Sequence, residues 1–178
     1  MTSPLHRRDF LKRAGALAAF TIIPAHVLRS ETAPSNHLTR ALLGFGGIAH
    51  SGNHLGYKDT RLVALCDVDA KRVQNGIDCA AKQGYGKIFA CRDFREILAR
   101  KDVDIIHICT PPHWHGLMSV MAAEAGKDVW CEKPMTRTIG EGRRVMEAVK
   151  ANGRIFRLNT WFRFQGDFYG FGTEVKPL

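Results

Sequence analysis

Short apolar runs alternate with stretches of helical periodicity along most of the chain. Leu38 to Phe45 is an apolar run that ends in glycines, and Arg61 to Cys66 is a second one that ends at Asp67. Runs that are apolar at nearly every position are typical of strands buried on both faces of a parallel sheet. The same pattern predicts four further strands, over residues 87–90, 103–109, 128–131 and 154–159.

The segments between these runs carry helix signals. Asp69 is placed to cap a helix that Gly84 ends, and Asp93 and Thr138 each precede a glutamate by three residues, the form of a capping box. Residues 47–55 are predicted to form the first crossover helix. Two later helices are predicted from apolar residues at helical spacing: Leu117, Val120, Met121 and Ala125 in one, and Ile139, Val145, Met146 and Val149 in the other.

Six strands joined by crossover segments predict an α/β fold with a doubly wound parallel sheet of the Rossmann type, over residues 31–160. The composition agrees with this prediction. The chain has 178 residues, of which 45% are hydrophobic and 24% charged. These values are close to those of an average soluble domain, and they exclude disordered, collagen-like and coiled-coil classes.

The charge of the chain is concentrated at its start. The net charge is +9, and the first thirty residues hold five basic residues and one acid, or +4 of that total. About +5 is left for the rest, which is a weak signal for nucleic-acid binding, so no nucleic-acid partner is predicted.

The first thirty residues are interpreted as a targeting signal. Arg7 and Arg8 precede Phe10-Leu11-Lys12 and an apolar run over residues 14–23. That run of about ten residues is too short to span a bilayer, so no stable membrane span is predicted. The segment resembles a twin-arginine export signal, which implies a folded protein delivered to the periplasm or another extracytoplasmic space. The alternative is a basic amphipathic first helix.

The cysteines and histidines do not form a recognisable metal motif. The five cysteines include no CxxC pair, which argues against a zinc ribbon or a disulfide framework, and they are interpreted as small buried hydrophobes. His113 and His115 have no third ligand at a suitable spacing, so no metal site is predicted. His107 lies inside a strand and is interpreted as a core residue, and His50 and His54 as packing or solvated residues.

A glycine-rich turn follows the first strand. Gly44, Gly46 and Gly47, with Ile48 and Ala49 behind them, form a GxGxxA sequence that opens the first crossover. Glycine lets a pyrophosphate reach the backbone amides at a helix N-terminus. Asp67 follows about twenty residues later at the end of the second strand, where an acid accepts hydrogen bonds from the ribose and repels a 2′-phosphate. NAD is therefore predicted over NADP, the alternative being a plain glycine turn. Arg72 is placed too far into the next helix to be assigned to a 2′-phosphate.

The sequence resembles the nucleotide-binding half of the Gfo/Idh/MocA oxidoreductase family, over about residues 38–160. The segments that carry the resemblance are residues 43–49, 64–69 (Ala-Leu-Cys-Asp-Val-Asp), 110–115 (Thr-Pro-Pro-His-Trp-His) and 125–134. The last of these, Ala-Gly-Lys-Asp-Val-Trp-Cys-Glu-Lys-Pro, is more specific than the glycine turn.

The resemblance implies roles for six residues beyond the glycine turn. It places Thr110 and Pro111 along the cofactor, makes His115 the family's helix histidine, and has Glu132, Lys133 and Pro134 line the cofactor site. Lys133 is implied to be catalytic, close to the nicotinamide and the substrate. A lysine at the carboxyl end of a strand can donate to a substrate oxygen and stabilise developing negative charge.

The family resemblance also implies the activity. It is hydride transfer by an NAD-dependent oxidoreductase acting on a sugar, cyclitol or related polyol, with a homo-oligomer as the full-length form. The alternatives are a glycosidase that uses bound NAD transiently and a non-catalytic nucleotide-binding remnant. Members of the family continue into a second α/β substrate domain. Residues 161–178 are expected to be its truncated start, so the family's acid/base residue has no counterpart here.

Overall fold

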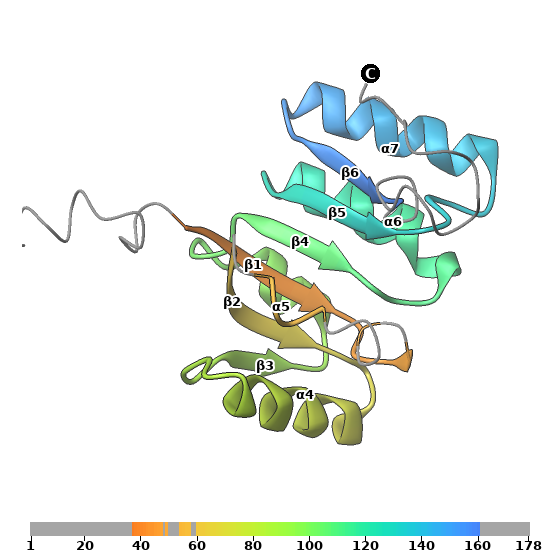
Figure 1. Cartoon of the computed structure of the whole chain (residues 1–178). Coiled ribbons are helices and arrows are strands. Elements are labelled where there is room, and N and C mark those ends of the chain that lie inside the picture. Colours follow the sequence, from red (N-terminus) through yellow and green to blue (C-terminus); the bar gives the residue numbers. More distant parts are fainter. Residues whose placement is uncertain (1–36, 48, 50–53, 58–59, 161–178) are drawn as a thin grey trace, which may run out of the picture. The chain divides into compact units, whose positions relative to one another are not determined.

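Six parallel strands form one sheet in the part of the chain that the computed structural model describes, residues 37–47, 49, 54–57 and 60–160. The strand order is β3-β2-β1-β4-β5-β6, which confirms the predicted doubly wound Rossmann sheet (Figure 1). The strands are β1 (Leu38–Leu43), β2 (Thr60–Cys66), β3 (Phe89–Cys91), β4 (Ile105–Ile108), β5 (Asp128–Glu132) and β6 (Phe156–Asn159).

Some predictions fall outside the described residues. The proposed export signal at residues 1–30, Ile48, His50 and the segment 161–178 are among these. Of the predicted first crossover helix, Gly47 and Ala49 are helical, and much of the remainder is not described. Among the described helices, none is both long enough and apolar enough to cross a membrane.

The two faces of the sheet are covered by different elements. The helices are α4 (Ala70–Lys82), α5 (Phe94–Leu98), α6 (Pro112–Glu124) and α7 (Ile139–Ala151). On one face, α5 and α6 bury Ile97, Met118 and Ala122 against Ile106 and Val129 of the central strands. On the other face, α4 and the segment after β1 form a second core. A third small core joins α6 to α7.

Helix starts agree with the sequence. The Asp69 side chain accepts a hydrogen bond from the Lys71 amide, and Asp93 does the same for Arg95. Thr138 caps α7 through the Glu141 amide at 3.2 Å. Each bond satisfies an amide that has no partner within its own helix.

The predicted buried faces of α6 and α7 are wrong in part. Leu117 is 52% exposed and Ala125 is also exposed, whereas Met118 and Ala122 are buried. In α7, Val145 and Val149 are buried as predicted, but Ile139 and Met146 are exposed. The apolar residues of these helices are spread over more than one face, so their spacing does not identify the face that the sheet covers.

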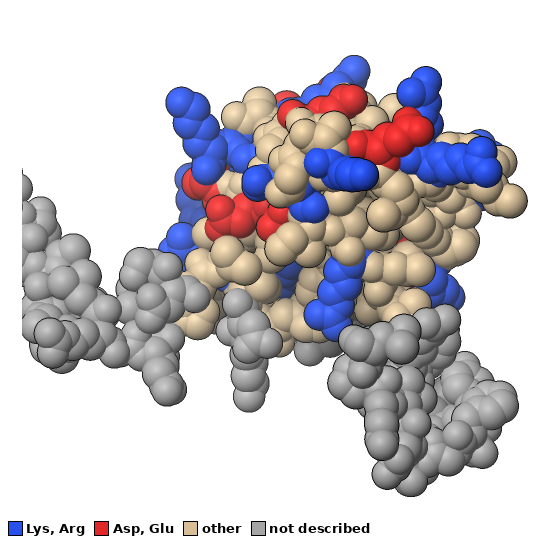
Figure 2. All heavy atoms as spheres, turned by 90° about the horizontal axis from the view of Figure 1, so that it is seen from above, with Lys and Arg blue, Asp and Glu red and all other residues tan. Residues whose placement is uncertain are grey.

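All six strands differ from the predicted ranges by one or two residues at one or both ends. The first strand ends at Leu43 rather than Phe45 because Gly44 has a φ of 89° and turns the chain. The third strand occupies Phe89–Cys91 rather than 87–90. On the face shown in Figure 2, lysine and arginine side chains lie among acidic ones instead of forming one continuous patch.

Candidate functional site

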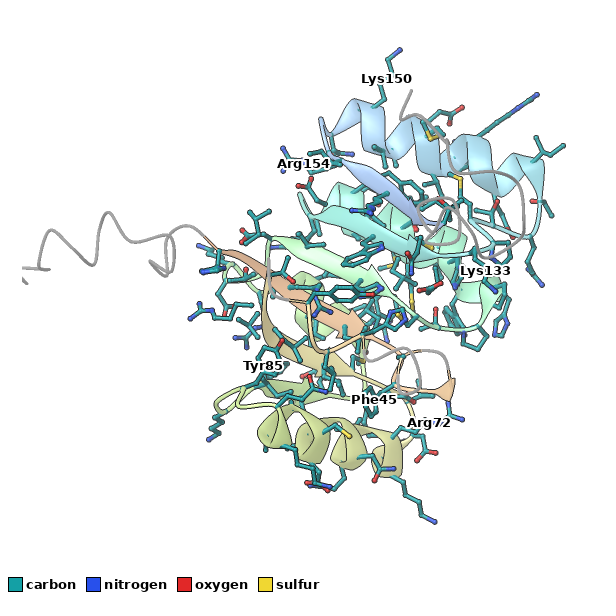
Figure 3. All side chains as sticks on the ribbon, in the orientation of Figure 1. Phe45, Arg72, Tyr85, Lys133, Lys150 and Arg154 are labelled. Atoms are coloured by element: carbon teal, nitrogen blue, oxygen red, sulfur yellow. The ribbon has the colours of Figure 1, made fainter. Side chains whose placement is uncertain are left out.

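The predicted site residues gather at the edge of the sheet where the parallel strands end. Figure 3 shows Phe45, Arg72 and Lys133 at this edge and Arg154 at the opposite one. The strand order reverses between β1 and β4, and open α/β sheets bind ligands at such a point. The fold therefore brings the glycine turn, the acid after β2 and the loops after β4 and β5 to one place.

The three glycines of the turn have different surroundings. Gly44 has a φ of 89°, and a Cβ there would lie 2.9 Å from the carbonyl carbon and oxygen of Cys109. At Gly46, a Cβ would lie 3.3 Å from Nη1 of Arg72. At Gly47, no described atom lies within 4 Å of the position of a Cβ. Gly44 is thus required by the packing of β1 on β4, whereas Gly47 leaves room for a ligand against the backbone.

Asp67 holds the glycine turn against the end of β2. Its side chain is buried, with Oδ2 accepting from the Phe45 amide at 2.8 Å and Oδ1 accepting from the Asp69 amide at 2.9 Å. A carboxylate oxygen can accept more than one hydrogen bond, so these two bonds leave capacity for a ribose hydroxyl. The position next to the turn is as expected, and the ribose contact stays a prediction.

Arg72 lies beside the turn, although its place in the sequence did not suggest this. Its Nη1 is the nearest atom to a Cβ built on Gly46, and its Nε is 3.9 Å from Oδ2 of Asp69. The first turn of α4 lies next to the glycines, so the Arg72 guanidinium is at the edge where the parallel strands end. An arginine there can pair with a phosphate oxygen.

His115 joins the two loops that the family resemblance assigns to the cofactor. Its ring is 1% exposed, with Nε2 2.7 Å from the carbonyl oxygen of Thr110 and Nδ1 2.6 Å from that of Pro134. One of these carbonyl groups belongs to the loop after β4 and the other to the loop after β5. His115 therefore connects the two loops to each other.

The loop after β5 begins with an exposed lysine. Lys133 is exposed and has no hydrogen bond or ion pair with any described residue, and it is joined to Pro134 by a cis peptide bond. Glu132 is buried and accepts a hydrogen bond from Nδ2 of Asn159. In the loop after β4, Pro111 is exposed and is the N-cap residue of α6. The structure thus brings Lys133 to the predicted edge but turns Glu132 into the interior.

Behind these loops lies a group of four side chains, the buried His54, His107 and Glu132 and the half-buried Cys109. The Nδ1 atom of His54 is 3.3 Å from Nε2 of His107 and 3.5 Å from Oε1 of Glu132. Burial lowers the pKa of both histidines, and for His54 the Glu132 carboxylate opposes this shift. Burial also raises the pKa of the Cys109 thiol well above its usual value. Both rings are therefore neutral at pH 7, and the thiol keeps its proton.

This group is not apparent as a unit in the sequence. His107 is a core residue as predicted, stacked on Trp130 with ring centroids 4.3 Å apart. His107 and Cys109 are two residues apart in and after β4, so they lie on the same side of the sheet. That alternation of polar residues in a buried strand was a usable signal. Nothing local in the sequence connects them to His54 or Glu132.

Comparisons with known proteins agree with the geometry. Residues 38–160 match the family model for Gfo/Idh/MocA, described as an oxidoreductase family with an NAD-binding Rossmann fold. A Shewanella baltica protein named glycosyl hydrolase family 109 protein is 28% identical, over 82% of this chain and 37% of that protein.

Two solved structures share the fold and a comparable level of identity. The WlbA dehydrogenase of Chromobacterium violaceum, in complex with NADH and UDP-GlcNAcA, is 25% identical with a TM-score of 0.61, over 69% of this chain and 35% of that one. The myo-inositol 2-dehydrogenase of Lactobacillus plantarum is 25% identical with a TM-score of 0.62, over 72% and 38%.

The chain spans little more than a third of the length of each of these relatives. The family match, in contrast, covers well over half of the chain itself. The chain belongs to the Gfo/Idh/MocA oxidoreductase family, of which it contains the NAD-binding Rossmann domain.

Proposed function

We propose that this protein is an NAD-dependent oxidoreductase that transfers hydride to or from a sugar, cyclitol or related polyol. The observation that carries the proposal is the position of Gly47 shortly after the end of β1, where no atom of the described residues meets a built Cβ, at the sheet edge that also presents Lys133. The phosphates of a dinucleotide must come close to the protein backbone, and its reactive ring needs a polar group beside it. This edge offers both.

The residues of the turn fit a dinucleotide. The backbone around Gly46 and Gly47 would face the pyrophosphate, and Asp67 would accept from the adenosine ribose. NAD is favoured because the Asp67 carboxylate would repel a 2′-phosphate. Arg72 lies within reach of the same region and would balance the phosphate charge. The bound nicotinamide would supply hydride transfer, and the chain would orient it.

Lys133 is proposed to act on the substrate oxygen. Its ammonium group is exposed at the edge and is not paired within the described residues, so it can donate to a substrate hydroxyl or carbonyl. Such a donor stabilises negative charge on that oxygen as the hydride leaves or arrives. His115 contacts the carbonyl oxygen of Pro134, the residue after Lys133, and that of Thr110 in the loop after β4.

Calorimetric titration of NAD and NADP into the Asp67→Asn variant tests the cofactor assignment. The amide removes the negative charge and keeps one acceptor oxygen, which can serve the Phe45 amide while the bond from the Asp69 amide is lost. We expect NAD to bind about tenfold more weakly and the preference over NADP to fall, because one charge-assisted hydrogen bond is worth about 1.5–3 kcal/mol. Asp78→Asn, on the exposed side of α4, is the matched control. Unchanged affinities for both cofactors in Asp67→Asn would contradict the assignment.

A second candidate is a glycosidase that uses bound NAD for transient oxidation, elimination and re-reduction. The name of the Shewanella baltica relative favours it. NADH absorbance during turnover separates the two activities, because a dehydrogenase accumulates NADH in excess over enzyme and the glycosidase does not. If the folded chain binds neither cofactor, it is a non-catalytic remnant and both enzyme proposals fail.

We further propose that the protein is exported by the twin-arginine pathway. The support is the Arg7-Arg8 pair ahead of the short apolar run. Replacement of both arginines by lysine keeps the charge and removes the paired guanidinium groups. We expect the protein to move from the periplasmic to the cytoplasmic fraction of a bacterial host, and equal export of both forms would refute the proposal.

A further inference from the structure

We propose that His54, His107, Cys109 and Glu132 form a closed tetrahedral site for a divalent transition metal of the zinc class. The four residues come from three separate parts of the chain, and their candidate ligand atoms all lie within 4.8 Å of one another. Imidazole, thiolate and carboxylate are the donors that zinc takes in proteins. The proposal replaces the sequence-based expectation of no metal and does not depend on the proposed hydride chemistry.

The distances between the donor atoms suit a tetrahedral ion. Tetrahedral coordination at the usual Zn–N and Zn–S lengths places ligand atoms about 3.3–3.8 Å apart. From Nδ1 of His54, the distances are 3.3 Å to Nε2 of His107, 3.5 Å to Oε1 of Glu132 and 3.7 Å to Sγ of Cys109. Ligand atoms that are as much as 4.8 Å apart must move about 1 Å closer to reach these tetrahedral distances. A movement of this size does not require a side chain to change its rotamer.

Packing already orients the two imidazoles. The His107 ring stacks on Trp130 with an angle of 7° between the planes, and the His54 ring meets Tyr57 edge-on with centroids 5.9 Å apart. His54, His107 and Glu132 are each at most 6% exposed, and Cys109 is half-buried. With four protein ligands and no open position, the site is of the structural kind, not a hydrolytic one.

Arg40 lies beside the cluster and determines which nitrogen of His107 carries the proton in the metal-free chain. It is buried, and its Nη1 lies 3.3 Å from Nδ1 of His107, where an arginine can only donate. Without metal, the His107 proton is therefore on Nε2 and is donated to His54. Metal binding would form the metal–Nε2 and metal–Sγ bonds, move the His107 proton from Nε2 to Nδ1 and release the proton of Cys109 to solvent. The Arg40 guanidinium would turn away from Nδ1 and keep its hydrogen bonds to the Thr60 hydroxyl and the Leu55 carbonyl oxygen. The thiolate and the carboxylate would then cancel the charge of the ion.

The metal site would connect the loops at the edge of the sheet where the parallel strands end. Cys109 directly precedes Thr110, and Glu132 directly precedes Lys133. An ion held by both would connect the ends of β4 and β5 to the segment that contains His54. The ion would make these loops more ordered and the fold more stable. Both effects can be measured without an activity assay.

Cobalt titration into the metal-free 178-residue chain tests the proposal. Co²⁺ bound by a thiolate in a tetrahedral site gives a charge-transfer band in the near ultraviolet and intense visible bands. We expect one Co²⁺ per chain with both features, displacement by Zn²⁺, and a higher melting temperature with Zn²⁺. Cys109→Ser should remove the charge-transfer band and weaken binding at least tenfold.

Matched variants keep the test decisive. Cys79→Ser removes a half-buried cysteine of α4, and His113→Gln removes an exposed histidine, so both should bind cobalt like the parent chain. Circular dichroism checks that Cys109→Ser is folded, and His107→Gln provides a second ligand variant. A weak octahedral cobalt spectrum in the folded parent chain, or bands that persist in both ligand variants, would overturn the proposal. The hydrogen-bonded chain from Arg40 through His107 to His54 would then account for the cluster.

Discussion

Gly44→Ala is expected to unfold the chain or to lower its free energy of unfolding by several kcal/mol. The new side chain meets two separate costs. A φ of 89° is outside the range that L-residues favour, at a cost of about 1–2 kcal/mol. The Cβ would also lie 2.9 Å from the Cys109 carbonyl group, which is backbone and moves only if β1 and β4 separate. Domains of this size are stable by only about 5–15 kcal/mol, so the loss is large.

Gly47→Ala is the matched control, with the opposite expected behaviour. No described atom lies within 4 Å of its Cβ, so the melting temperature should stay close to that of the parent chain. NAD affinity should fall at least tenfold, because the methyl group occupies the space through which the pyrophosphate reaches the backbone. Denaturant unfolding and calorimetric titration of both variants provide the measurements. Equal loss of stability in both variants would show that the two glycines do not have separate roles.

Acid should destabilise the metal-free protein steeply below about pH 6.5, the ordinary pKa of histidine. Burial lowers the pKa of His54 and His107 in the folded state. Above pH 6.5 both histidines are neutral in both states and contribute nothing. Below it the unfolded chain binds protons that the folded chain does not, so stability is lost as the pH falls toward the lowered pKa values. Each histidine adds a slope of up to about 1.4 kcal/mol per pH unit.

Urea unfolding between pH 7 and pH 5, with a chelator present, measures this slope. His107→Gln should make the curve shallower by up to about 1.4 kcal/mol per pH unit, since the glutamine does not titrate. His113→Gln, at an exposed position outside the buried cluster, is the control variant. A slope that is the same in the parent chain and His107→Gln would contradict the assignment of the acid sensitivity to this buried ring.

Those features of the chain that depend on neighbours in sequence could be predicted from the sequence. The apolar runs determined the strands, since a strand buried on both faces is apolar at almost every position. Asp69, Asp93 and Thr138 marked helix starts because a cap bonds to amides only two or three residues away. The position of Asp67 beside the glycine turn followed from the known geometry of two adjacent parallel strands.

Other features were decided only by the tertiary structure. Arg72 reaches Gly46, and His54 meets Glu132, because the crossovers place distant segments side by side. The exposure of Ile139 and Leu117 depends on which neighbours cover α6 and α7. Local periodicity gives the direction of a side chain relative to its own element, but not the partner that it meets. Side chains about 50 to 80 residues apart converge only once strand order and crossovers are set, so the buried His-Cys-Glu cluster is a property of the fold.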